Sequence, residues 1–345
     1  MSAPRFLLLI ALATLVALTG LSLLPQDRYQ RFAEAATESK HYLRIKWIYE
    51  RIHFDETPID VAFIGTSHTQ SAVDSRIVEA ALRARGQDVH VVNFAVPHLG
   101  RDLHWLLVRE LLTSRRVREL VVEVQDFEPR APHPAFQRLG SVGDLVESPL
   151  IVNTGFFDNL ARLPRRQLDL FMPAMAGRSA FVFSPRGYEG PHWDDTERLH
   201  GFDQQRTGTH PAAYLDEQAA LLRTALHDKE RLAGRLRLPS GCSVLKHYNR
   251  FYLDSLLNLA RERGVHVTFL YLPFFRGPEQ PLEAALYEPY GPIVKPQGVL
   301  DDVTSWLNVD HLNVSGARRT SQWLGDNLAV AAPGRPLPAI AAPCS

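Results

Sequence analysis

The sequence predicts an α/β fold: a doubly wound parallel sheet in three layers, with a mostly helical insertion and an apolar N-terminal segment. Apolar runs of strand length alternate with amphipathic runs of helix length in both halves of the chain. Strands that alternate with helices form parallel sheets covered by helices on both faces. The chain has 345 residues, 45% of them hydrophobic, enough to bury the core of one large domain or two smaller ones.

The N-terminal segment, "FLLLIALATLVALTGLSLL" at residues 6–24, carries no charge. As a helix, a run of this length can cross a hydrocarbon layer of ~30 Å. A cleaved signal has a shorter apolar region and a small-residue cleavage site, whereas Pro25 and a charged run follow here. We therefore expect residues 1–25 to be an uncleaved signal anchor with the body exported, and a cleaved signal is the alternative. Residues 26–57 are expected to form a charged helical stalk that carries the domain away from the bilayer.

The alternating pattern fills residues 58–330 apart from an interruption at about 129–244. That interruption is rich in Pro, Gly, Arg and aromatic residues and is interpreted as an insertion or lid. The Pro/Ala-rich residues 331–345 are expected to be a disordered tail. The pattern predicts strands at 59–65, 88–95, 118–124 and 265–275, and helices at 75–86, 100–116, 212–236, 248–264 and up to 328.

Charge and cysteine content exclude several classes of protein. Basic and acidic residues number 38 each, so no overall field draws the chain to nucleic acid. Cys242 and Cys344 are the two cysteines and neither lies in a CxxC motif, which argues against a disulfide framework or structural zinc. The run "HWDD" at 192–195 fits no familiar ligand spacing. We expect neither a metal nor a cofactor.

The first predicted strand ends in Gly65-Thr66-Ser67. Reactive groups of open α/β sheets gather at the carboxyl ends of the strands, so Ser67 is a candidate nucleophile. The alternative is that Ser67 caps the helix that follows. A base is available from the other end of the chain, where His311 lies in "NVDHLNVSGA", residues 308–317, just before the last helix. A doubly wound sheet can bring this loop against the loop after the first strand.

These segments together resemble the SGNH hydrolase superfamily, the GDSL-type esterases and their acyltransferase relatives. The resemblance covers roughly residues 58–128 and 245–328. It implies that Ser67 is the nucleophile, that His311 is the base, and that the N–H groups of Ser67 and Gly100 bind the oxyanion.

Two positions depart from the family pattern. The acidic position of the family's D-x-x-H motif is Asn308 here, which could orient the imidazole without supplying a charge. We expect Asp310 to be the third catalytic member, and a Ser–His dyad is the alternative. The family's oxyanion asparagine is missing after the third strand. Gln125 could supply that donor, or two backbone donors could act alone.

The anchored topology is similar to that of the membrane-bound polysaccharide O-acetyltransferase-like branch. This resemblance implies an inner-membrane protein with a periplasmic domain that transfers or hydrolyses O-acyl groups on a cell-envelope or exported polysaccharide. A membrane-bound protein would then be the acyl donor. One alternative is a catalytically inactive glycan-binding scaffold in a polysaccharide modification or secretion complex. Another is hydrolysis of lipid esters.

Overall fold

The computed structural model describes residues 3–38, 43–150, 153–175, 190, 210–235 and 247–331. Five strands form the sheet: β1 (Val61–Ile64), β2 (Val91–Asn93), β3 (Glu119–Glu123), β4 (His266–Leu270) and β5 (Ile293–Val294). The long helices of the α/β domain are α5 (Ser75–Ala84), α6 (Arg101–Ser114), α12 (His247–Glu262) and α13 (Val314–Asn327). The short helix α4 (Ser67–Ala72) follows β1, and the 3-10 turns η3 (Ala284–Leu286) and η4 (Val303–Ser305) follow β4.

All neighbouring strands of the sheet are parallel, in the order β2-β1-β3-β4-β5. Phe63 of β1 pairs with Asn93 on one side and with Val121 on the other. This strand order is that of flavodoxin-like folds, in which ligands bind where the order reverses, beyond the carboxyl ends of β1 and β3. The predicted α/β parallel sheet is confirmed. The two-residue strand β5 was not predicted.

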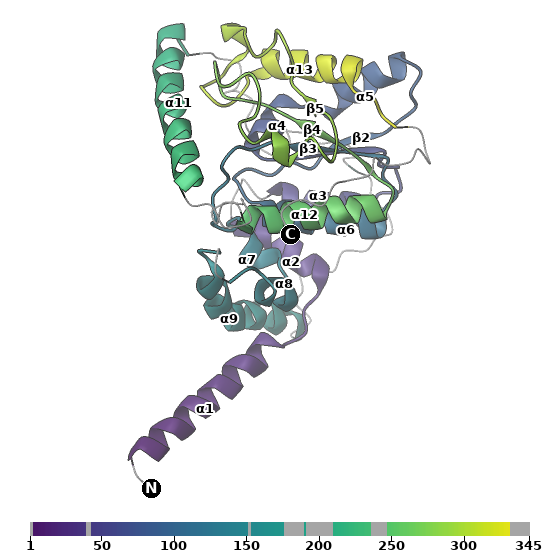
Figure 1. Cartoon of the computed structure of the whole chain (residues 1–345). Helices are drawn as coiled ribbons and strands as arrows, with labels where there is room; N and C mark the ends of the chain where they lie inside the picture. The colour runs from purple at the N-terminus through teal and green to yellow at the C-terminus, as the bar shows by residue number, and fades with distance from the viewer. Residues whose placement is uncertain are drawn as a thin grey trace.

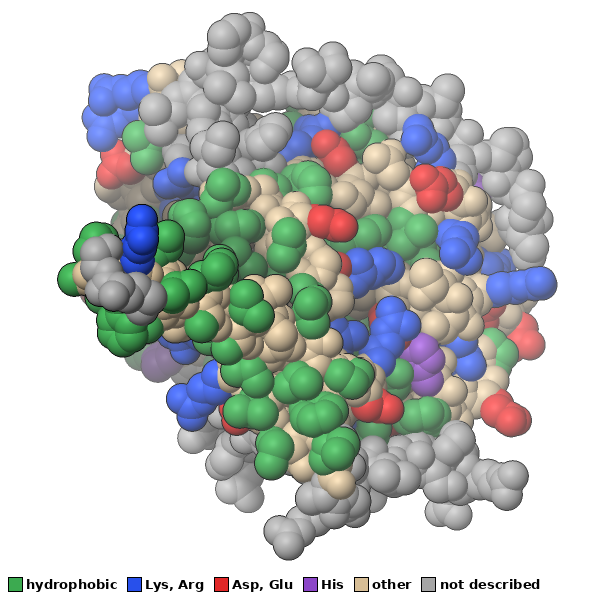
Figure 2. Space-filling model, turned by 90° about the horizontal axis from the view of Figure 1, so that it is seen from below, with side chains coloured by type: hydrophobic (Ala, Val, Ile, Leu, Met, Phe, Trp, Pro, Cys, Tyr) green, Lys and Arg blue, Asp and Glu red, His purple; other side chains and the backbone are tan. Residues whose placement is uncertain are grey.

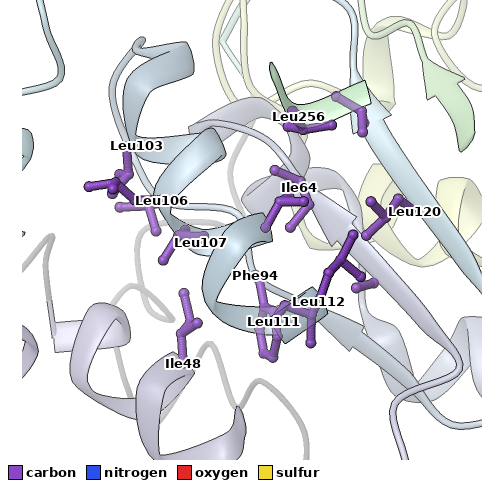
Figure 3. Packing of buried hydrophobic residues seen from close by; sticks show 14 of the residues in the cluster. Ile48, Ile64, Phe94, Leu103, Leu106, Leu107, Leu111, Leu112, Leu120 and Leu256 are labelled. Carbon is purple, nitrogen blue, oxygen red and sulfur yellow. The ribbon is translucent and has the colours of Figure 1, made fainter. Parts of the chain in front are cut away.

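The core lies in two layers because successive strand residues point to opposite faces. Ala62 and Ile64 of β1 face a cluster beneath α6 and α12, whereas Val61 and Phe63 face one beneath α5 and α13. Figure 3 shows part of the first cluster, which includes Leu107 and Leu111 of α6 together with Ile64 and Phe94. Each face of the sheet is thus closed by helices, which gives the three layers.

Two side chains define helix starts on the second face. Asp74 accepts a hydrogen bond from the N–H of Arg76 at the start of α5, and Asn313 accepts one from Gly316 at the start of α13. The two helices touch at Gly325, where a Cβ atom would lie 2.3 Å from the Cβ of Ala81. Only a residue without a side chain allows this close approach.

The N-terminal region contains α1 (Ala3–Ser22), α2 (Arg28–Glu38) and α3 (Leu43–His53). Helix α1 projects from the base of the molecule (Figure 1). None of its residues is buried, and it is long and apolar enough to cross a membrane. A membrane anchor and a signal sequence share these features.

Helices α2 and α3 pack into the core, because Phe32, Ile45 and Ile48 are at most 3% exposed. The expected stalk is therefore corrected: this stretch is part of the folded domain and not a spacer. The charged residues of this stretch led us to expect exposure to solvent, but some of them are buried. Arg51 is 1% exposed, and it donates to the carbonyls of Thr57 and Pro58 and pairs with Asp55.

The expected insertion contains α7 (Phe136–Leu139), α8 (Val142–Val146), α9 (Phe156–Met175) and α11 (Ala212–Arg235). Helices α7, α8 and α9 lie at the base near α1, whereas α11 stands along the side of the α/β domain (Figure 1). The "HWDD" run at 192–195, Cys242, Cys344 and the expected tail from residue 332 onward lie outside the described residues.

Candidate active site

Ser67 and His311 meet, although they are 244 positions apart in the chain. The Ser67 Oγ lies 2.9 Å from the Nε2 of His311. Ser67 is the first residue of α4, directly beyond β1. His311 lies in the loop before α13, so the first and last β-to-α connections form the contact.

The helix-cap alternative for Ser67 does not hold, because Thr66 occupies that position. The Thr66 side chain accepts a hydrogen bond from the N–H of His68 and is the N-cap of α4. The Ser67 hydroxyl instead faces the imidazole of His311.

The loop that carries His311 is a tight turn tied to the rest of the fold. Trp306 and Leu312 form an antiparallel bridge across it, and the carbonyl of His311 accepts the N–H of Leu307 at 2.9 Å. The N–H of Phe275, beyond β4, donates to the carbonyl of Val309 at 2.7 Å. These bonds fix the position from which the imidazole reaches Ser67.

Two oxygens lie near the other ring nitrogen of His311. Its Nδ1 is 2.8 Å from the Oδ1 of Asp310 and 3.2 Å from the Oδ1 of Asn308. The Asn308 oxygen also accepts the backbone N–H of His311 at 2.8 Å and that of Asp310 at 3.2 Å. Asn308 therefore shapes the turn, and Asp310 supplies the charge.

The pKa of Asp310 is lowered from its ordinary value. Partial burial raises it, but the hydrogen bond from His311 and the charges of His311 and His68 lower it further. An ionised Asp310 holds Nδ1 protonated, which leaves Nε2 free to accept the proton of Ser67.

Glu123, at the carboxyl end of β3, is a site residue that sequence reasoning missed. Its carboxylate accepts the backbone N–H of Thr66 at 2.7 Å and the hydroxyls of Thr66 and Thr69 at 2.8 and 2.6 Å. Burial raises its pKa, but the nearby His68 and the hydrogen bonds from Thr69, Thr66 and Gln125 outweigh burial and lower it to about 2. Glu123 thus holds the corner that carries Ser67. The one signal in the sequence was an acid directly after the apolar residues 120–122 of β3.

Gly65 makes room for this carboxylate. A Cβ at Gly65 would lie 2.3 Å from the Oγ1 of Thr69 and 2.4 Å from the Oε2 of Glu123. Atoms without a bond between them do not approach so closely, so glycine is required by packing. The glycine of the Gly65-Thr66-Ser67 motif therefore has a physical reason that is independent of chemistry at Ser67.

His68 lies between the two acids of the site. Its ring nitrogens are 3.8 Å from Glu123 and 3.9 Å from Asp310, and its ring meets that of His311 edge-on at 5.2 Å. His68 lines the cavity. Ligand atoms of His68, Asp310 and His311 also lie within 4.8 Å of one another, an arrangement that could hold a metal ion and that the sequence did not predict.

The expected oxyanion donors differ in their surroundings. Ser67 begins α4, so its N–H belongs to the first helical turn, where donors lack an intrahelical acceptor. Gly100 caps α6 and is packed so that a Cβ would lie 2.4 Å from that of His133. Gln125 donates its amide Nε2 to Glu123 at 3.1 Å, and its Oε1 has no partner among the described residues. All three oxyanion roles stay predictions.

A cavity of about 520 Å³ opens over Ser67. Its polar lining residues include Ser67, His68, Gln125 and Asp310, and His98 and Leu99, just before Gly100, line it as well. His98 has a φ of 77°, an unfavourable value for a residue with a side chain. Helix α11 closes one side of the cavity with Leu222, Ala225, Leu226 and Lys229. The insertion thus forms a wall of the candidate site.

The fold and the site define a parallel α/β protein that has a serine, a histidine and a carboxylate in hydrogen-bond contact at the carboxyl ends of its strands. No protein-family model matches the sequence, and no curated protein matches it significantly.

Proposed function

We propose that this protein is an SGNH-type serine enzyme, an O-acyltransferase or esterase, that is exported and anchored through α1. One observation carries the proposal: the Ser67 Oγ lies 2.9 Å from the His311 Nε2, while the Nδ1 of that ring lies 2.8 Å from Asp310. A nucleophile, a base and a charged orienting group in this order are the elements of serine acyl transfer. Their position beyond β1 and before the last helix supports the SGNH resemblance.

In the first half-reaction, Ser67 Oγ attacks the carbonyl carbon of an ester and His311 Nε2 takes the hydroxyl proton. The tetrahedral oxyanion is held by the N–H of Ser67, with Gly100 and Gln125 as the further expected donors. When the intermediate collapses, the bond from carbon to the leaving oxygen breaks, and His311 returns its proton to that oxygen. Ser67 is left as an acyl ester. Asp310 stabilises the imidazolium in both steps.

In the second half-reaction, water or a sugar hydroxyl attacks the acyl carbon and gives its proton to His311. The bond from that carbon to Ser67 Oγ then breaks, and His311 returns the proton to Ser67. The acceptor decides whether the protein is an esterase or a transferase. The wall that α11 adds to the cavity favours transfer, because a site that limits the access of water protects the acyl ester from hydrolysis. An exported or cell-envelope polysaccharide is the proposed acceptor, and a membrane-bound protein is the proposed donor. An inactive glycan-binding scaffold is the competing function.

The test uses the full chain in detergent or nanodiscs, a fluorophosphonate probe and a chromogenic acetate ester. We expect labelling and ester cleavage by the wild type and the loss of both in Ser67→Ala and His311→Ala. The matched control is Ser255→Ala, because Ser255 lies on α12 and its hydroxyl donates to the carbonyl of Phe251 in the same helix. A wild type that resists the probe and binds polysaccharide would favour the scaffold.

Treatment with a chelator distinguishes the serine mechanism from a metal-assisted mechanism at His68, Asp310 and His311. Labelling of Ser67 needs no metal and is expected to be unchanged in EDTA. Activity that disappears with EDTA and returns with zinc would replace the serine mechanism by a metal-assisted one.

A further inference from the structure

Helix α9 presents an exposed apolar stripe on one side. Phe157, Ala161, Leu168, Met172 and Met175 are exposed at helical spacing, and Phe157 and Met175 are 74% and 69% exposed. These residues fall on one side of the helix because four- and seven-residue steps return to the same face. Leaving these apolar side chains in water is unfavourable in free energy.

The rest of α9 is accounted for by other contacts. On the face toward the domain, Leu163 and Leu170 are buried. On the edge beside the stripe, the charges pair within the helix: Arg162 with Asp158 at 2.9 Å and Arg165 with Asp169 at 3.6 Å. Among the described residues of α9, the apolar stripe alone thus lacks an explanation in the fold.

The stripe lies where α1 leaves the domain. The Nε2 of Gln167 donates to the carbonyls of Ser22 and Leu24, both at 3.1 Å, at the end of the apolar N-terminal helix. The Nε2 of Gln30, on α2, donates to the carbonyl of Leu170 at 2.8 Å. These hydrogen bonds from Gln167 and Gln30 therefore hold α9 beside the C-terminal end of α1.

The same end of the molecule carries further apolar groups. Val146 at the end of α8 and Leu150 just beyond it are 57% and 50% exposed. Figure 1 places α8 and α9 at the base from which α1 projects, and Figure 2, which views that base, shows hydrophobic side chains gathered beside α1. A continuous apolar surface on a monomer marks a contact with another phase or molecule.

We propose that α9 lies in the interface of the membrane that α1 enters, with its apolar stripe among the lipids. The occupant is lipid because the stripe adjoins a helix of membrane-spanning length and composition. The paired charges of Arg162 and Arg165 flank the stripe at headgroup level, as in helices that lie in the membrane plane. This inference rests on the proposed anchoring by α1.

The consequence is a second attachment point. One transmembrane helix alone would let the domain turn and tilt above the bilayer. With α9 also held, the domain keeps one face on the membrane, and the cavity over Ser67 stays at a fixed height.

Spin labels test the proposal in the full chain. Single cysteines replace Phe157, Met172, Leu12 or Leu221 in a background in which Cys242 and Cys344 are serine, and each labelled protein is reconstituted into vesicles. Leu12 on α1 reports whether the anchor is inserted, and Leu221 on α11, which is 60% exposed, is the water control. We expect labels at Phe157, Met172 and Leu12 to show an oxygen-to-nickel accessibility ratio several-fold above that at Leu221.

Each other outcome overturns the proposal in a distinguishable way. Labels at Phe157 and Met172 that match Leu221, with Leu12 in lipid, leave the anchor in place and remove α9 from the membrane. Labels shielded from both oxygen and nickel indicate a protein partner or a second copy. A water-exposed Leu12 overturns the anchoring itself. The two α9 positions are read independently, so the failure of one variant to fold does not spoil the test.

Discussion

At the level of single side chains, the groups near the Nδ1 of His311 divide two tasks. Asn308 binds backbone N–H groups and shapes the turn, whereas Asp310 brings a negative charge to the ring. The two residues can therefore be separated by mutation.

Asp310→Asn keeps the size of the side chain and removes its charge. We expect the kcat/KM for the acetate ester to fall roughly 10²- to 10⁴-fold, because the imidazolium loses its counter-charge and the tautomer is no longer fixed. The melting temperature should change little. Asn308→Ala should instead lower thermal stability along with activity, because three hydrogen bonds to its oxygen are lost. Unchanged kinetics in Asp310→Asn would leave a Ser–His dyad as the working unit.

Glu123 gives a pH prediction. Its pKa is lowered from 4.5 to about 2 in the folded chain. A carboxylate with a lowered folded pKa stabilises the fold above its unfolded pKa, and that contribution is lost as the pH falls from about 4.5 to about 2. The contribution is on the order of 3 kcal/mol.

Urea unfolding of the wild type and of Glu123→Gln at pH 7 and at pH 3 measures this contribution. The variant is expected to be less stable at pH 7, and the difference between the two proteins should shrink at pH 3. A difference in the free energy of unfolding that is independent of pH would show that folding leaves the pKa of Glu123 unchanged, which contradicts the prediction.

The contact between Ser67 and His311 was predictable because motifs in the sequence contain both residues. Ser67 follows a strand and His311 precedes the last helix, and fold topology explains why they meet. Glu123 was not predictable, because its role depends on the hydroxyls of Thr66 and Thr69, at the start of α4, turning toward the end of β3. No pattern along the chain shows such a contact between segments that are far apart in the sequence.

At the level of elements, the sheet and its covering helices followed from the alternation of apolar and amphipathic runs. Helices α2 and α3 lie within the expected helical stalk, but their burial was not predicted, since their charged residues suggested contact with solvent. Arg44 and Arg51 are buried and donate hydrogen bonds to backbone carbonyls. The charge of these side chains therefore did not predict whether they are exposed. Strand β5 escaped prediction because two residues are too short for any periodic pattern.

The contact between α5 and α13 predicts how much stability is lost when Gly325 is replaced by alanine. Gly325→Ala would place a Cβ 2.3 Å from that of Ala81 and 3.1 Å from the carbonyl oxygen of Val78, so the helices must move apart. We expect a loss of about 1–3 kcal/mol in the free energy of unfolding.

The matched control is Gly234→Ala on α11. A Cβ at Gly234 meets nothing within 4 Å, so the change should be neutral or stabilise by up to ~1 kcal/mol. Thermal unfolding compares the two variants. Equal melting temperatures would show that α5 and α13 do not pack closely at Gly325.

At the level of the whole molecule, α11 joins the insertion to the candidate site. Ala225 lines the cavity, so Ala225→Trp should fill part of it. We expect the kcat/KM for a bulky ester to fall more than that for the acetate ester, with no change in melting temperature. Thr224→Trp, on the neighbouring exposed position of α11, serves as the control. Identical selectivity in both variants would place the substrate away from α11.

The separation of 244 positions between Ser67 and His311 has a consequence for biogenesis. A chain that emerges N-terminus first presents its serine early and its imidazole among the last segments to appear. The proposed reaction therefore cannot take place during synthesis and export. A product truncated before the loop that carries His311 would have the serine but no base. Under this proposal, Ser67 becomes reactive only after the loop that carries His311 has been synthesised and has folded.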